Sequence, residues 1–267
     1  MTTPDFGCHK LALSRTGRSG VLAAVAAGFA LGTLLLPPFP QPIAYHEFAD
    51  ARRILGIPNF WDVLTNLPFL LVGVAGLAFL LRERRAQAAF QDSGERWPYA
   101  VLFVGVALTC AGSAYYHLAP DNARLAWDRL PMTVGFMSIV AAMVAERVNT
   151  QAGLRLLAPL VALGVASVVW WRVSAAWGVE NLHPYLAVQA GSIAMVLLIA
   201  LLFPSRYTRG NDIYLVVALY AAAKVAEYLD QALYSVGSML SGHSLKHLLA
   251  AGAVYQVLRM LKARSLK

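Results

Sequence analysis

Long apolar stretches alternate with short polar segments along the whole of this 267-residue chain. Each stretch is close to the roughly 20 residues that an α-helix needs to cross the hydrocarbon core of a bilayer. Eight are present, at residues 20–37, 60–81, 98–117, 127–146, 154–171, 184–203, 212–230 and 243–261. The pattern therefore predicts an all-α protein, a polytopic transmembrane helical bundle.

The first stretch also has features of a secretory signal, because Lys10, Arg15 and Arg18 precede it. The segment that ends it, 34–40, reads Leu-Leu-Leu-Pro-Pro-Phe-Pro and lacks the small residues of a cleavage site. We therefore expect the first stretch to be retained as a membrane span.

The composition agrees with a membrane protein. Hydrophobic residues make up 58% of the chain and charged residues 13%, against about 25% charged in an average soluble domain. The net charge of +8 does not indicate nucleic acid, because the charges stand in clusters between the apolar stretches. The lipid bilayer is the partner that this arrangement predicts. The two cysteines, Cys8 and Cys110, form neither a disulfide framework nor a cysteine metal site.

The placement of lysine and arginine orients the predicted spans, since these residues collect in the short cytoplasmic loops of membrane proteins. If the N-terminus is cytoplasmic, fifteen lysine and arginine residues fall in the tails and loops on the cytoplasmic side. The outside segments contain only Arg52, Arg53, Arg124 and Arg172. We therefore expect an integral membrane protein with both termini in the cytoplasm.

Several polar residues stand at span ends that this topology brings to the outer membrane face. His117 ends the third span, Asp128 begins the fourth, and His243 and His247 begin the eighth. Ser113 lies four residues before His117, on the same face of the predicted helix. Since ionisable groups are costly inside a membrane, their shared depth indicates a functional site near the outer face.

The histidine spacing is that of a metal site. His243 and His247 are four residues apart, so both imidazoles project from one helical face, and His117 supplies a third ligand. Three protein nitrogens with an open fourth position are typical of catalytic zinc, which makes bound water acidic. We expect zinc as the cofactor and Ser113 and Asp128 as catalytic groups, the carboxylate taking the proton of the water and the hydroxyl holding the water or the substrate oxygen.

Each of these residues also has a plain structural interpretation. His117 could cap its span, and Asp128 could stabilise the positive end of a helix. A second polar group lies along the seventh span, where Lys224 and Glu227 can pair and fix helix packing, or can form a proton relay together with Asp230. Asp230 lies nearest the outer end of that span, where it could support the zinc ligands from behind.

At these positions the sequence resembles the alkaline ceramidase family, within the wider superfamily of seven-span metal-dependent membrane hydrolases. The matching motifs are Gly-Ser-Ala-Tyr-Tyr-His at 112–117, Asp-Arg-Leu-Pro-Met at 128–132 and His-Ser-Leu-Lys-His at 243–247. The segment 59–66, Asn-Phe-Trp-Asp-Val-Leu-Thr-Asn, is similar to the opening of that family's first span. The resemblance covers about residues 45–262.

The resemblance implies a zinc-dependent hydrolase that cleaves the amide bond of a ceramide-like membrane lipid, giving a fatty acid and a sphingoid-type amine. His117, His243 and His247 would bind zinc, and Ser113 and Asp128 would position and activate water.

The resemblance also implies a domain organisation. Residues 45–267 would form a seven-span ceramidase-like domain, preceded by a cytoplasmic tail and an extra transmembrane helix at 1–44. Eukaryotic members carry a calcium site as well, to which Asp50 and Asn59 could contribute here. The short loops and Ala/Leu-rich spans are similar to bacterial members, which implies a bacterial inner membrane.

Other functions stay open at this point. A proton-coupled transporter would use Lys224, Glu227 and Asp230 as its relay, although the chain lacks the internal repeats common in carriers. A zinc lipid hydrolase could act on a bond other than an amide. A haem protein could use two histidines from different spans.

Overall fold

A computed structural model describes residues 13–82 and 89–267 of the chain. Cys8 and Lys10 lie outside the described residues, as do Arg84 and Arg85, two of the fifteen basic residues assigned above to the cytoplasmic side. Helices make up the described part, with two isolated β-bridges and two short 3-10 turns, η1 (Ile43–His46) and η2 (Ser93–Glu95). The predicted all-α bundle is confirmed.

The helices follow the predicted stretches to within a few residues at most ends. Their bounds are α1 Arg15–Leu35, α2 Phe60–Leu64, α3 Leu67–Leu81, α5 Arg96–Leu118, α6 Asn122–Arg147, α7 Thr150–Ala176, α8 His183–Leu202, α9 Asp212–Tyr228, α10 Asp230–Gly237 and α11 Gly242–Ala263. Several begin where a polar side chain accepts a hydrogen bond from the first turn. Asp121 caps α6, Asn149 caps α7 and Ser241 caps α11.

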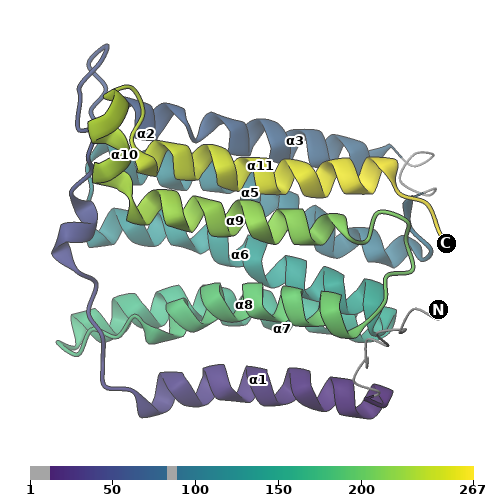
Figure 1. Cartoon of the computed structure of the whole chain (residues 1–267). Coiled ribbons are helices and arrows are strands. Elements are labelled where there is room, and N and C mark those ends of the chain that lie inside the picture. The colour runs from purple at the N-terminus through teal and green to yellow at the C-terminus, as the bar shows by residue number, and fades with distance from the viewer. Residues whose placement is uncertain (1–12, 83–88) are drawn as a thin grey trace, which may run out of the picture.

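Six of the described helical segments are long and apolar enough to cross a membrane, with α2 and α3 taken together as one. The other two predicted spans, α9 and α11, run beside these six in the bundle (Figure 1) and have 17 and 22 residues. The chain is therefore a membrane-embedded helical protein.

The bundle is built around α6. In the most apolar 18-residue segment of α6, 72% of the residues are buried, whereas the share for the corresponding segment of α1 is 0%. Figure 1 shows α1 at the edge of the bundle, where Phe29 packs on Gly191 of α8. α1 therefore contributes little to the buried part of the bundle.

Two predicted spans are interrupted in the structure. The helix at 60–81 breaks between α2 and α3. Pro68, in the first turn of α3, has no N–H to donate to a preceding carbonyl. The side chains of Thr65 and Asn66 donate instead to the carbonyl oxygens of Trp61 and Asp62. Both interruptions lie at the end of the bundle that carries the predicted site.

The second interruption is at Leu229, between α9 and α10. The prediction that Asp230 lies within the seventh span is therefore wrong. Its carboxylate instead accepts the backbone N–H groups of Ala49 and His243, which turns the chain out of the α9 axis.

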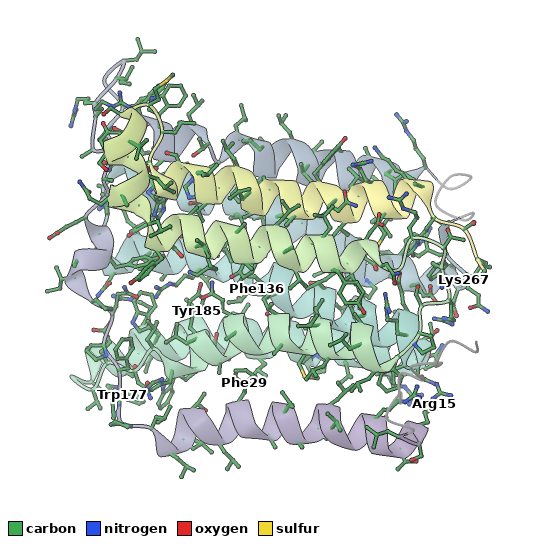
Figure 2. All side chains as sticks on the ribbon, in the orientation of Figure 1. Arg15, Phe29, Phe136, Trp177, Tyr185 and Lys267 are labelled. Carbon is green, nitrogen blue, oxygen red and sulfur yellow. The ribbon has the colours of Figure 1, made fainter. Side chains whose placement is uncertain are left out.

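The two ends of the bundle differ in chemistry. Arg15 and Lys267 lie at one end and Trp177 at the other (Figure 2). The Arg15 end is closed by a buried polar network, in which Arg264 pairs with Glu146, and Tyr99 donates to Glu146 over 2.9 Å. This network attaches the chain after α11 to α5 and α6, which fixes α11 along the bundle axis.

Candidate metal centre

Three buried histidines meet at the end of the bundle opposite Arg15. His117 comes from the last turns of α5, and His243 and His247 come from the first two turns of α11. Their ring centroids are 4.9, 5.0 and 5.1 Å apart, and one ligand nitrogen from each lies within 4.8 Å of the others. The group could hold a metal ion, as the sequence predicted.

The start of α11 is fixed in place by its neighbours. Asp230 Oδ1 accepts the His243 backbone N–H over 2.7 Å, and Ser241 Oγ accepts that of Ser244 over 3.0 Å. Gly242 lets α9 come close, since a Cβ there would lie 2.1 Å from the carbonyl oxygen of Ala226. Asp230 therefore supports His243 through its backbone, which agrees with the supporting role that the sequence suggested for it.

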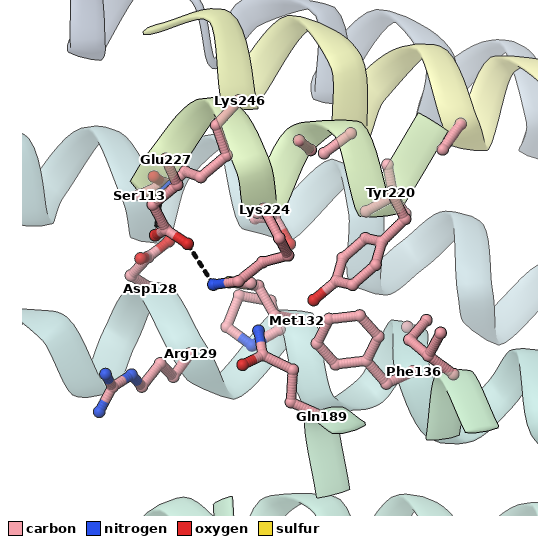
Figure 3. A pocket seen from close by; sticks show the side chains of 18 of the residues that line it. Ser113, Asp128, Arg129, Met132, Phe136, Gln189, Tyr220, Lys224, Glu227 and Lys246 are labelled. Carbon is pink, nitrogen blue, oxygen red and sulfur yellow. Dashed lines mark hydrogen bonds and ion pairs between the residues drawn. The ribbon is translucent and has the colours of Figure 1, made fainter. Parts of the chain in front are cut away.

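A second close approach brings α5 to α6. A Cβ on Gly112 would lie 2.2 Å from the carbonyl oxygen of Trp127, so glycine is the residue that this contact allows. Ser113 and Asp128 follow these two residues, and Ser113 lies beside the Asp128 carboxyl group (Figure 3). The predicted pair of catalytic groups is thus brought together, next to the histidine-bearing end of α5.

A threonine orients one of the histidines. Thr65 donates its hydroxyl hydrogen to the Trp61 carbonyl oxygen over 2.6 Å, so its oxygen accepts from His247 Nδ1, 3.0 Å away. His247 Nε2 then carries the lone pair and is free for a metal ion. Such outer hydrogen bonds fix the tautomer and the ring orientation of metal-binding histidines.

Replacing Thr65 with valine is expected to lower zinc affinity about 10- to 100-fold, because the shape is kept and the acceptor for His247 is lost. Competition against a chelator of known zinc affinity measures the change. Thr133→Val is the matched control, since Thr133 is also buried and, among the described residues, its hydroxyl bonds to Leu130 of its own helix. Equal affinities for the two variants would show that Thr65 does not support the site.

Unpartnered nitrogens show that the cluster fits a cation. Within the described residues, neither ring nitrogen of His117 has a hydrogen-bond partner, and neither does Nε2 of His247, although all three atoms are buried. Buried polar atoms without partners are rare and costly. Because a neutral imidazole carries one N–H and one lone pair, a metal ion would satisfy one nitrogen of His117 and Nε2 of His247 and so remove most of that cost.

Lys246 is the one charged side chain, among the described residues, that hydrogen-bonds to an imidazole ring of the cluster. Its ammonium lies 2.9 Å from His243 Nε2 and 3.0 Å from Glu227 Oε1. Because an ammonium group can only donate, it takes up the Nε2 lone pair in this arrangement. A metal ion bound through His243 Nε2 would displace the Lys246 ammonium from that nitrogen. The ammonium could then remain paired with Glu227.

Phe48 covers the cluster from the loop before α2. Its ring centroid lies 4.7 Å from those of His117 and His243. The backbone N–H of the next residue, Ala49, donates to Asp230 Oδ2 over 2.9 Å. Asp230 therefore anchors both the covering loop and the helix that carries two of the histidines.

A cavity of about 330 Å³ opens beside the cluster. Ser113 and Asp128 line it together (Figure 3), and His247 lines it as well. Most of the other lining side chains are apolar and come from α5, α6, α8, α9 and α11. Those apolar residues include Leu102, Ile139, Val196, Val217 and Val257. The site thus stands at the polar end of a long apolar cavity.

The second polar group of the sequence is divided between two places. Lys224 pairs with Glu227, as predicted, and both line the cavity. Asp230 instead bonds to backbone N–H groups at the start of α11. The three do not line one path, which weakens the support for a proton relay through them.

The residues considered for calcium have other partners. Both Asp50 oxygens accept from the Arg52 guanidinium, at 2.7 and 2.6 Å. Burial alone would raise the pKa of Asp50, but the hydrogen bonds and charge of Arg52 outweigh it and hold this pKa below its ordinary value. Asn59 donates its amide to the His117 carbonyl over 2.8 Å. These contacts do not favour a calcium site.

Sequence reasoning gave no role in the site to Thr65, Phe48 or Arg129. Thr65 lies in the 59–66 motif and Arg129 in the 128–132 motif, so the family resemblance was an available signal for both. Phe48 lies in neither motif, and its role depends on how its loop packs over the histidines.

Compared with models of protein families and with curated proteins, the chain matches none. Assignment of a function therefore depends on the site itself.

Proposed function

We propose that this protein is a zinc-dependent membrane hydrolase that cleaves the amide bond of a lipid. The observation that carries the proposal is the cluster of three buried histidines with unpartnered nitrogens, next to a buried carboxyl group at the head of an apolar cavity. Three imidazoles with room for a further ligand are the usual protein ligands of catalytic zinc.

The residues have distinct roles in this proposal. His117, His243 and His247 hold the metal ion, which when bound supplies a Lewis acid that polarises a carbonyl group and acidifies water. Asp128 accepts the proton of the attacking water and passes it to the leaving nitrogen. Ser113, beside it, donates a hydrogen bond to the oxygen on which negative charge develops.

The cavity supports a lipid substrate. Its apolar length accepts an acyl chain, and burial of each methylene group contributes about 0.8 kcal/mol to binding. The amide then lies at the polar end, near Ser113, Asp128 and His247. A ceramide-like lipid, the substrate implied by the family resemblance, has both parts.

The proposal includes an orientation. Arg15 and Lys267 lie at one end of the bundle (Figure 2), where Arg206 bonds to the Glu146 carbonyl oxygen and Arg264 to that of Ala89. By the distribution of charge in membrane proteins, this basic end is the cytoplasmic one. The histidine cluster then lies near the outer face of the membrane. We propose that this membrane is the inner membrane of a bacterium.

The test is release of fatty acid from a defined lipid. Zinc-loaded protein in nanodiscs is expected to hydrolyse N-dodecanoyl sphingosine, with chelation abolishing and zinc restoring the activity, because water activation depends on the metal. Free dodecanoic acid is measured by mass spectrometry, and a dodecanoyl ester of the same size is the second substrate. If only the ester is cleaved, the protein is a lipid esterase and the proposed amide substrate is wrong. If neither lipid is cleaved, the proposed hydrolase activity is wrong.

A further inference from the structure

Arg129 is a buried cation on the wall of the cavity that the proposed hydrolysis does not use. Its side chain is 4% exposed, and its guanidinium carbon lies 4.6 Å from the ring centre of Trp171 and 4.5 Å from that of Tyr185. Nη2 donates to Gln41 Oε1 over 2.6 Å. Cation–π contacts and one amide oxygen therefore hold the group in a fixed position.

The guanidinium is incompletely satisfied. Nη1 is buried and has no hydrogen-bond partner in residues 13–82 and 89–267, and no ion pair within those ranges includes Arg129. A buried charge without a counter-charge is costly to maintain. An anionic group that enters the cavity would remove that cost.

The charges that line the cavity do not balance one another. The cavity is lined by three cations, Arg129, Lys224 and Lys246, and by two carboxyl groups, Asp128 and Glu227. Glu227 is already paired with both lysines. The described lining therefore has an excess of positive charge even before a metal cation is added.

The shape of the free group favours a carboxylate. A guanidinium group presents its N–H donors in one plane, which matches the planar carboxylate of a ligand. Gln41 and Tyr45, beside Arg129, line the same polar end of the cavity as Ser113 and Asp128. A carboxylate here would belong to the head of a molecule whose acyl chain lies in the apolar part.

From these observations we infer that Arg129 binds a carboxylate on the amine half of the substrate, so that the preferred substrates are fatty acids in amide linkage to an amino acid. The inference deepens the proposed function and depends on it for the cleaved bond. The recognition itself, an acyl chain in the cavity with a carboxylate on Arg129, does not require cleavage.

Binding to metal-free protein tests the recognition separately from hydrolysis. N-Dodecanoylglycine and N-dodecanoylethanolamine have the same chain and amide, and differ in carrying a carboxylate or a hydroxyl group. Equilibrium dialysis of each against metal-free protein in neutral phosphatidylcholine nanodiscs is expected to show 10- to 100-fold tighter binding of the glycine lipid, the range for hydrogen bonds to a charged group.

Variants assign the preference to one residue. Arg129→Gln should reduce the preference for the glycine lipid to about twofold or less. Arg129→Lys should retain only part of the preference, because it keeps the charge and loses the planar donors. Arg124→Gln is the matched control, because Arg124 is on the same helix, at its outer turn, and pairs with Asp121 at the surface. That variant should bind both lipids as wild type does.

The outcomes separate the two proposals. Equal binding of the two lipids by the wild type would overturn the inference, as would a preference that survives in Arg129→Gln or is lost equally in Arg124→Gln. If the protein hydrolyses lipid amides with no preference for a carboxylate, the proposed function holds and this inference is wrong. A preference that depends on Arg129 in a protein without hydrolase activity would support the inference while the proposed function fails. If Arg129→Gln does not fold, a folded Arg129→Met variant replaces it, and a carboxylate preference that survives in that variant would also overturn the inference.

Discussion

Replacing both His243 and His247 with alanine is expected to remove zinc from the protein without unfolding it. One imidazole, that of His117, is then left, and a single neutral ligand does not retain zinc against a mild chelator. The fold should persist, because Asp230 and Ser241 hold the start of α11 through its backbone rather than through the imidazoles. About one zinc per chain in the wild type and none in the variant is the expected elemental analysis.

Thermal unfolding gives an independent measurement. A ligand that binds only the folded protein stabilises it by about 2.7 kcal/mol at a concentration 100 times its Kd. Zinc should therefore raise the unfolding temperature of the metal-free wild type and leave that of the double variant unchanged. The two proteins should have the same far-ultraviolet circular dichroism spectrum.

The matched control for the zinc measurement is His183→Ala. His183 is a partly exposed histidine of α8, and its Nε2 lies 3.0 Å from the Pro37 carbonyl oxygen, away from the cluster. This variant should keep its zinc. Zinc retained by the double variant, or absent from a carefully prepared wild type, would contradict the metal centre, and with it the hydrolase.

The convergence of the histidines could be predicted because it depends on topology alone. In a bundle of antiparallel spans, the end of one odd-numbered span and the start of an even-numbered one lie at the same membrane face. His117 and His243 occupy such ends, so their shared depth follows from counting the apolar stretches. The structure confirms the meeting of these residues with His247. Hydrophobic patterning thus located the candidate site before any contact was known.

The supporting contacts could not be predicted in the same way. That Thr65 reaches His247 depends on the break between α2 and α3, and a break between two apolar segments leaves no trace in hydropathy. Asp230 looked like a membrane-embedded carboxylate, because the apolar pattern continues through the bend at Leu229. In both cases short polar side chains bond to nearby backbone groups and end a helix that hydrophobicity alone would continue.

Arg129 shows a different limit of sequence reasoning. Next to Asp128 it could be interpreted as a partner for that carboxylate, but neighbouring positions on a helix project about 100° apart. The structure directs Arg129 toward Trp171 and Tyr185, which are far from it in sequence. Its environment is thus set by the packing of α6 with α7 and α8.

Replacing Asp128 with asparagine is expected to lower kcat for lipid-amide hydrolysis by about 10²- to 10⁴-fold, the usual contribution of a positioned acid–base group. The amide keeps the shape of the side chain and can still meet Ser113, but it cannot take a proton from water. KM and zinc content should change little, because the three metal ligands are histidines. Steady-state kinetics on zinc-loaded protein, with metal analysis of the same sample, measures all three quantities.

Asp121→Asn makes the comparison strict, because it is the same substitution on the same helix. Asp121 caps α6 by accepting the Arg124 backbone N–H over 2.7 Å, a role that asparagine also fills, and it is absent from the residues that line the cavity. That variant should keep wild-type kcat. If Asp128→Asn instead loses its zinc, the carboxylate supports the metal more directly than proposed. If it keeps full activity, the water must lose its proton to another group, and Glu227, paired with two lysines on the cavity wall, is the next carboxylate to test.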